Sequence, residues 1–165
     1  MKKIAIMIFT FFMMTHLNAQ EVKRTLGVGL QASFPTYGIS AKYGITDQSV
    51  IQATIAPFSS GLFSVNFYGA RYIHRFPDKD QGKVSLDPYI YGGAGLMSFK
   101  TDLSGFGMGK STESFFSYSL GGGVELIFAK KLGLSAELGY GKMNVVEGVS
   151  VSGILGGGGL HFYIF

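Results

Sequence analysis

The sequence contains no cysteine and no tryptophan, and only 15% of its 165 residues are charged. The absence of cysteine excludes a disulfide scaffold, Cys-ligated zinc, thiol catalysis and a lipid-anchored N-terminal cysteine. The charged fraction is below the roughly 25% of an average soluble domain. The formal charge of +4 comes from 14 Lys and Arg against 10 Asp and Glu, and no basic run longer than two residues occurs. We therefore expect no nucleic-acid partner.

Glycine and aromatic residues are abundant instead, with 25 Gly, 15 Phe and 9 Tyr. Each glycine inside a helix destabilises it by about 1 kcal/mol, so this composition disfavours helices. The glycines have no three-residue period of the collagen type. The length is sufficient for one domain. We expect an all-β domain.

The N-terminal segment has the pattern of a signal peptide. Lys2 and Lys3 precede an almost wholly apolar run at residues 4–17, followed by Asn18 and Ala19. This run is shorter than the roughly 20 apolar residues of a spanning helix. The pattern predicts a cleavable signal peptide at residues 1–19 and one β domain at residues 20–165.

After residue 20 the apolar residues alternate with small or polar ones, as in strands. Interruptions rich in Gly, Pro, Ser and charged residues separate the alternating segments. The pattern predicts eight strands, at residues 26–34, 37–45, 50–56, 62–76, 88–99, 115–128, 132–143 and 153–165. Side chains alternate between the two faces of a strand, so the apolar residues of the sixth and seventh strands lie on the same face only if an odd number of residues connects the strands. The three residues 129–131 meet this condition.

The non-apolar face of these strands indicates where the sheet lies. In the sixth and seventh strands that face is mostly Gly and Ser, with Glu125 and Glu137. Small residues suit the narrow interior of an eight-stranded closed sheet, whereas a water-facing surface would carry more charge. The apolar face then points outward, toward lipid, where open sheet edges are not tolerated. The sequence predicts an eight-stranded antiparallel up-and-down transmembrane β-barrel.

Aromatic residues near the predicted strand ends are interpreted as two interfacial girdles. The first girdle comprises Phe34, Tyr37, Phe58, Phe63, Phe99 and Phe116, and the second comprises Tyr43, Tyr72, Phe76, Tyr89, Tyr91, Phe128, Tyr163 and Phe165. If the mature N-terminus is periplasmic, the even strand count returns the C-terminus to the same side. The connections at 35–36, 57–61, 100–113 and 144–152 would then be extracellular, and those at 46–49, 77–87 and 129–131 periplasmic.

The chain finishes on Leu-His-Phe-Tyr-Ile-Phe at residues 160–165. Together with the signal-peptide pattern and the eight strands, this resembles the small outer-membrane β-barrel proteins, the group of the X-type, W-type and A-type barrels. Phe165, with an aromatic Tyr163 two residues earlier, resembles the C-terminal signal read by the barrel-assembly machinery. The resemblance implies a place in the outer membrane, with its lipids and lipopolysaccharide as partners. It does not identify an extracellular partner, and we expect no peptidoglycan-binding domain.

A few charged residues fall on the predicted inner face: Lys42, Arg71, Glu125 and Glu137, with His161 if the last strand follows the apolar alternation, as we expect. Unhydrated charges must be paired. Glu125 and Glu137 lie diagonally across one hairpin, so they would share a cation or one would be protonated. We expect Arg71 or Lys42 to complete a polar network that fills the lumen.

Three other functions remain as alternatives. A lipid A-modifying enzyme could use His161 as base, Glu137 as its orienting acid and Ser117 or Ser119 as nucleophile. However, no serine lies two residues from His161, where the deacylase barrels place theirs. A soluble secreted ligand-binding barrel would need the strand faces inverted. A narrow solute channel is the third alternative, although side chains normally fill eight-stranded barrels.

Sequence motifs give no indication of a cofactor or metal. Residues 107–112 end like a phosphate-binding loop, but Ser104 stands where the first glycine is required and a strand follows. The other glycine clusters lie within predicted strands, where they serve packing and curvature. We therefore expect a non-enzymatic outer-membrane protein with a structural or surface-interaction role, acting through residues 100–113 and 144–152, without cofactors.

Overall fold

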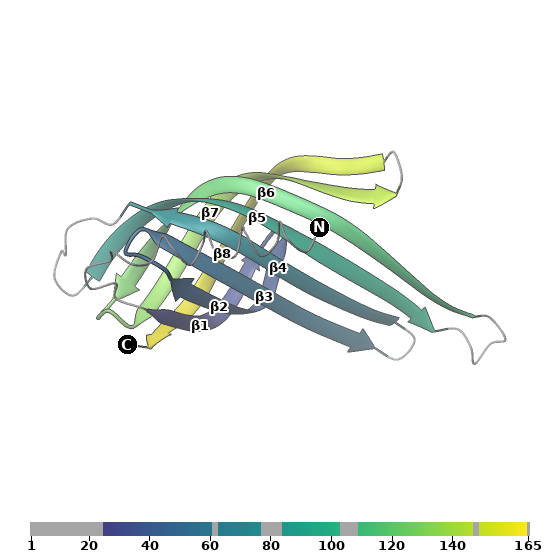
Figure 1. Ribbon diagram of the computed structural model, residues 1–165, viewed down its shortest axis with the longest axis horizontal. Helices are drawn as coiled ribbons and strands as arrows, with labels where there is room; N and C mark the ends of the chain where they lie inside the picture. The colour runs from purple at the N-terminus through teal and green to yellow at the C-terminus, as the bar shows by residue number, and fades with distance from the viewer. Residues whose placement is uncertain (1–24, 61–62, 77–83, 103–108, 147–148, 165) are drawn as a thin grey trace, which may run out of the picture.

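The computed structural model describes residues 25–60, 63–76, 84–102, 109–146 and 149–164. Eight antiparallel strands in sequence order form a closed barrel, in which β8 pairs with β1 (Figure 1). The strands are β1 (Leu26–Ser33), β2 (Thr36–Gly44), β3 (Ser49–Ser60), β4 (Phe63–Arg75), β5 (Val84–Asp102), β6 (Lys110–Phe128), β7 (Leu132–Val146) and β8 (Val149–Ile164). No helix in these residues is long and apolar enough to cross a membrane. The predicted eight-stranded antiparallel barrel is confirmed.

The β6–β7 connection has the predicted length and register. Phe128 pairs with Leu132 across the three residues between them, and Lys131 N–H donates to Phe128 O at 2.9 Å. Ala129 and Lys130 adopt left-handed φ values of 49° and 60°. The odd connection keeps the apolar side chains of both strands on one face.

The strands are longer than predicted at the end of the barrel away from the start of β1 and the end of β8. We call this the distal end, and the opposite one the terminal end. β5 and β6 contain 19 residues each, β7 continues to Val146 and β8 begins at Val149. The predicted loops at 100–113 and 144–152 were therefore too long, as was the connection at 77–87. The distal extensions of β5 and β6, at residues 100–102 and 110–114, lack the apolar alternation of a lipid-facing strand, although their backbones still pair.

Two prolines lie inside strands rather than at their ends. Pro57 lies within β3, which was predicted to end at residue 56, and Pro88 lies within β5, which was predicted to begin at residue 88. Pro57 pairs with Asn66 of β4, although residues 57–61 were predicted as a loop. β3 pairs with β2 only as far as Ile55, so Pro57 is on the free edge of its strand. Proline is tolerated on such an edge because it cannot donate a ladder hydrogen bond.

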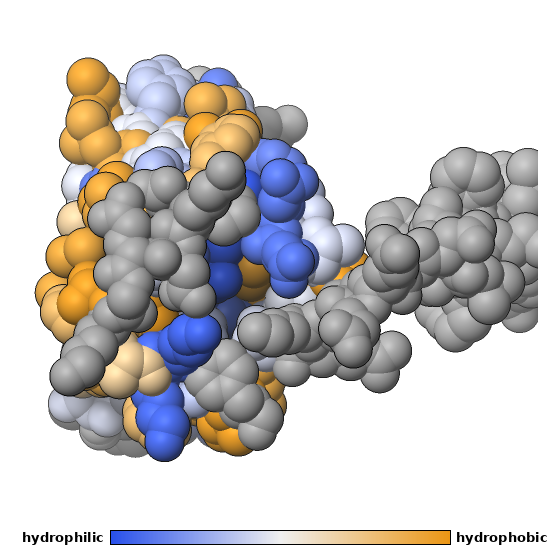
Figure 2. All heavy atoms as spheres, turned by 90° about the vertical axis from the view of Figure 1, so that its left-hand side faces the viewer, coloured by the Kyte–Doolittle hydropathy of each residue, from blue (hydrophilic) through white to orange (hydrophobic). Residues whose placement is uncertain are grey.

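The outer face of the barrel is apolar. Leu120 and Leu138 are each 62% exposed, and the members of this belt come from all eight strands. Its members include Val28, Leu30, Ile39, Ile51, Ile55, Tyr68, Tyr72, Leu96, Phe116, Leu134, Ile154, Leu160 and Phe162. Figure 2 looks onto the barrel from the side nearest the C-terminus and shows hydrophobic side chains at its left edge, with hydrophilic ones toward the middle. Such a belt matches the lipid-facing surface of a transmembrane barrel.

The inner face has glycines where large side chains need room. A Cβ at Gly123 would meet the ring of Tyr89 at 2.7 Å, and one at Gly133 would meet the ring of Tyr163 at 2.8 Å. Tyr89, Tyr91 and Tyr163 are buried inside the barrel, at 3%, 7% and 3% exposure. Their assignment to the second girdle was therefore wrong, because glycines on neighbouring strands open space for them inside. The predicted girdle residue Phe165 lies outside the described residues.

The β1–β2 turn at residues 33–36 folds into the barrel and covers its distal end. β2 bends at Gly38, whose φ of +104° is in the region that favours glycine. The turn packs against four glycines of other strands: Ser33 lies near Gly157, Phe34 near Gly141, Pro35 near Gly95 and Thr36 near Gly69. Ser119 Oγ donates to Phe34 O at 3.1 Å. The girdle assignment of Phe34 was wrong, since its ring lies against the inward-facing Gly141.

Candidate functional site: the polar network inside the barrel

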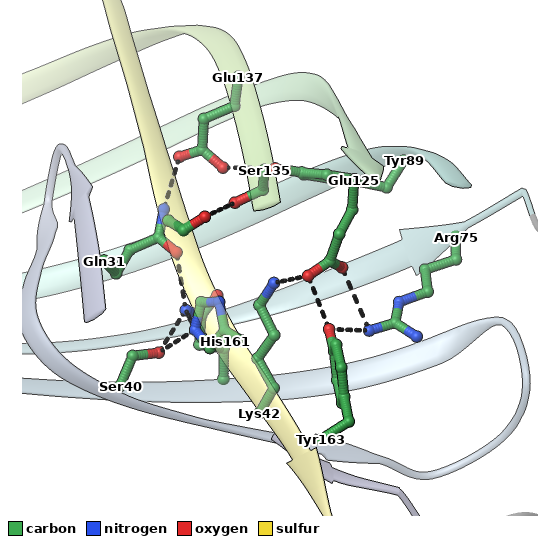
Figure 3. Close-up of polar contacts among 12 residues, drawn as sticks. Gln31, Ser40, Lys42, Arg75, Tyr89, Glu125, Ser135, Glu137, His161 and Tyr163 are labelled. Atoms are coloured by element: carbon green, nitrogen blue, oxygen red, sulfur yellow. Dashed lines mark hydrogen bonds and ion pairs between the residues drawn. The ribbon is translucent and has the colours of Figure 1, made fainter. Parts of the chain in front are cut away.

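Charged side chains from four strands meet inside the barrel (Figure 3). Lys42 on β2, Arg71 on β4, Glu125 on β6 and Glu137 on β7 are exposed by only 1%, 3%, 1% and 7%. Each occupies an inward position because its neighbours in the strand belong to the lipid-facing belt or are small. The four side chains form two groups of contacts, one around each carboxylate.

Glu125 is the centre of the group nearer the terminal end. Its Oε1 accepts hydrogen bonds from Lys42 Nζ at 2.9 Å and from Tyr163 Oη at 2.7 Å. Arg75 Nη2 lies 3.4 Å from Oε2 and donates to Tyr163 Oη at 2.9 Å. One carboxylate therefore has two cationic partners and one hydroxyl donor, which compensate for the loss of its hydration.

Glu137 is the centre of the second group. Arg71 Nη1 lies 2.7 Å from Oε1 and 2.9 Å from Oε2 of Glu137, and Tyr89 Oη donates to Oε2 at 2.8 Å. The Arg71 guanidinium also stacks over the ring of Tyr91, 4.8 Å from its centroid. Arg71 Nε donates to Gln52 Oε1 at 2.5 Å. The two glutamates thus do not share a cation, because each has its own.

Neutral side chains extend the network toward β1 and β8. Gln52 Nε2 donates to Ser40 Oγ at 2.5 Å and to Gln31 Oε1 at 3.1 Å. His161 Nε2 lies 2.9 Å from Ser40 Oγ and 3.3 Å from Gln52 Nε2. His161 is 0% exposed and points inward. Together these contacts connect buried side chains of β1, β2, β3 and β8 across the lumen.

Several members of the network were not identified from the sequence. Arg75 lies four residues after Arg71, and Gln52 is the register partner of Arg71, so strand alternation alone could have identified both. Tyr163 has the same parity as His161 but was assigned to a girdle. Asp87, assigned to a connection, is an inward residue of β5 with 7% exposure. An aromatic residue near a strand end can face either lipid or lumen, which the sequence pattern does not distinguish.

The side chains considered for catalysis are not assembled. Ser117 Oγ donates to Gly95 O and Ser119 Oγ to Phe34 O, both at 3.1 Å. His161 contacts Ser40 and Gln52 instead, while Glu137 is bound by Arg71 and Tyr89. These candidate residues thus do not line up as nucleophile, base and acid in the order that a triad needs. Among the residues described, no group of three or more His, Cys, Asp or Glu could hold a metal ion.

Comparison with known proteins gives the family. The model of the outer membrane protein beta-barrel domain matches residues 5–162. The fold resembles the N-terminal β-barrel domain of OprF from Pseudomonas aeruginosa, with a TM-score of 0.61 and 17% identity over 87% of this chain and 100% of that one. Neisserial surface protein A (NspA) gives a TM-score of 0.49 and 20% identity over 85% and 92%. No curated protein is significantly similar in sequence. The chain belongs to the outer membrane protein beta-barrel domain family, whose place is the outer membrane.

Proposed function

We propose that the protein has a structural and surface-interaction role in the outer membrane, without enzymatic activity and without a path for solutes through its lumen. The observation that supports this most directly is the buried network of charged side chains inside the lumen. The network around Glu125 and Glu137 occupies its middle, and the turn at 33–36 covers its distal end. Function then depends on the surfaces outside the lumen.

The distal hairpins are the surface that we propose for interaction. We place the terminal end in the periplasm, so that removal of residues 1–19 leaves the mature N-terminus there. The β3–β4, β5–β6 and β7–β8 hairpins then extend outward beyond the apolar belt (Figure 1). Lys110 and Asp102 form an exposed ion pair at 2.7 Å near the end of the β5–β6 hairpin. Lipopolysaccharide would surround this surface.

Assembly is the other interaction that we propose. The barrel-assembly machinery would recognise Tyr163 and Phe165. In the closed barrel Tyr163 is buried and bonded to Glu125 and Arg75. Its side chain would therefore be accessible to a receptor only before β8 pairs with β1.

Electrical conductance in planar lipid bilayers tests the closed lumen. Purified wild-type protein is expected to give no stable conductance steps, while a general porin inserted in the same bilayers serves as the positive control. Stable steps would favour the narrow channel instead, provided that the protein is folded, as judged by a different gel mobility before and after boiling. Mass spectrometry of lipid A from expressing cells is expected to show no change in acylation, and a changed acyl pattern would refute the non-enzymatic role.

Shortening one hairpin tests the surface role. Ser98 and Ser114 are register partners, so an Asn-Gly turn can replace residues 99–113 while the barrel below stays paired. Cells with the shortened chain should keep the gel mobility of a folded barrel and lose adhesion or aggregation relative to wild type. Equal adhesion with both chains would contradict a surface role for this hairpin.

A further inference from the structure

The wall of the barrel is uneven in height. β1 and β2 are joined at residues 33–36, whereas β3 continues to Ser60 and β8 starts at Val149, well beyond the short hairpin (Figure 1). The pairing of β2 with β3 reaches Ile55, and that of β1 with β8 reaches Gly158. Beyond these pairs, the edges of β3 and β8 have no strand between them in the described part of the chain. The closed barrel therefore opens sideways above the β1–β2 hairpin.

A cavity of about 270 Å³ lies above the β1–β2 turn, between that turn and residues of β4, β5, β6 and β7. Its lining residues are Phe34, Pro35, Tyr37, Phe67, Leu96, Met97, Ser117 and Met143, of which only Ser117 and the Tyr37 hydroxyl are polar. The ring of Tyr37 meets the ring of Phe67 edge-on at 5.6 Å between centroids. Tyr37 is on the lipid-facing side of β2, whereas Phe67 shares the inward face of β4 with Arg71. The lining thus includes side chains from both faces of the sheet.

The cavity lies at the distal border of the apolar belt. Leu96 on β5 and Tyr68 on β4 are register partners on the outer face, 50% and 48% exposed. The next outward pair toward the distal end is polar, Asn66 with Ser98. The hydrocarbon region therefore ends near Leu96, because lipid-facing positions beyond it no longer carry large apolar side chains. The free edge of β8 beside the opening carries Ile154 on its outward face, 77% exposed, so the opening reaches the acyl chains of the adjacent leaflet on its β8 side.

We propose that this cavity binds one acyl chain of a membrane lipid, which enters sideways from the distal leaflet. The lining carries no charge for a headgroup, and its apolar side chains favour hydrocarbon. The volume is just below the 300–1,000 Å³ of typical small-molecule sites, so it accommodates part of one chain and not a whole lipid. A peptide is disfavoured, because its backbone polar groups would lack partners here. The bound chain completes the barrel wall that the short hairpin leaves open.

The absence of tryptophan makes a direct test possible. The Phe67→Trp variant places a single indole in the cavity, and the Leu120→Trp variant places one in the lipid-facing belt as a control. Both are reconstituted in phosphatidylcholine vesicles with and without bromine atoms on the acyl chains, which quench nearby indoles. We expect the Phe67→Trp variant to be quenched at least half as strongly as the Leu120→Trp variant.

Filling the cavity distinguishes a bound chain from lipid lying beside the barrel. Ser117→Leu adds volume on β6, and Met143→Phe does so from β7 if the first variant does not fold, as judged by gel mobility. In the Phe67→Trp background, filling should reduce quenching at least twofold. In the Leu120→Trp background, filling the cavity should leave the quenching unchanged.

Any of four other results would overturn the inference. Unquenched Phe67→Trp beside quenched Leu120→Trp would mean that no chain enters, although the barrel is inserted. Quenching that persists after filling would place the lipid outside the cavity. Quenching of Phe67→Trp by aqueous acrylamide instead of bromine would mean a water-filled cavity. Absence of bromine quenching in both variants would refute the membrane placement on which the proposed function also depends.

Discussion

Glu125 is the position where the lumen network can be tested most sharply. Its carboxylate accepts from Lys42 and Tyr163 and lies 3.4 Å from Arg75 Nη2. The Lys42–Glu125 pair has 1% exposure at both side chains. Glu125→Gln keeps the shape but leaves the charge of Lys42 without its counter-charge. Removing one partner of a buried pair costs about 3–5 kcal/mol. We expect the lower end of that range, about 3 kcal/mol, because the amide oxygen can still accept.

Three further variants make the prediction quantitative. Lys42→Met removes the stranded charge, so the Lys42→Met/Glu125→Gln double variant should lose less stability than the sum of the single losses, with a coupling of about 0.5–3 kcal/mol. Asp102→Asn is the matched control, because its ion pair with Lys110 is exposed by 45% and 71%. Exposed pairs contribute only about 0–1 kcal/mol.

The assay is equilibrium urea unfolding of the reconstituted barrels, followed by far-UV circular dichroism and by gel mobility of unheated samples. The free energies of unfolding of all four variants are compared with wild type under the same lipid conditions. If Glu125→Gln costs no more than Asp102→Asn, the lumen is hydrated and the argument from desolvation is refuted.

Two further predictions concern the two faces of the barrel. Gly139→Val should destabilise the protein by about 1–3 kcal/mol, because the Cβ would collide with the hydroxyl of Tyr91 inside the lumen. Gly92→Val has open space around its Cβ and should change stability by less than about 0.5 kcal/mol. Equal effects of the two variants in urea unfolding would mean that the lumen can repack. Leu138→Arg on the lipid-facing belt should cost about 2–4 kcal/mol, whereas Ser114→Arg beyond the belt should cost about 0–1 kcal/mol. Equal costs in vesicles would contradict the assignment of the outward face to lipid.

Local patterns in the sequence were sufficient for the strand count and the direction of the faces. Two-residue alternation places Leu120 and Leu138 on one side of the sheet and Glu125 and Glu137 on the other, because successive side chains in a strand point in opposite directions. The three-residue β6–β7 turn followed from the same rule. Alternation is less informative beyond the bilayer, where both faces meet water, and the distal strand extensions were therefore missed.

Only the tertiary structure determined which inward residues meet. Lys42 and Glu125 are 83 residues apart, and their contact depends on closure of the barrel and the stagger of its strands. The same closure brings the turn at 33–36 against glycines of β4, β5, β7 and β8, and places Tyr163 inside. The sequence by itself determined the strands and the side of the sheet each residue takes, because these depend on neighbours along the chain. The network, the covered lumen and the cavity above the β1–β2 turn were decided by contacts between distant strands.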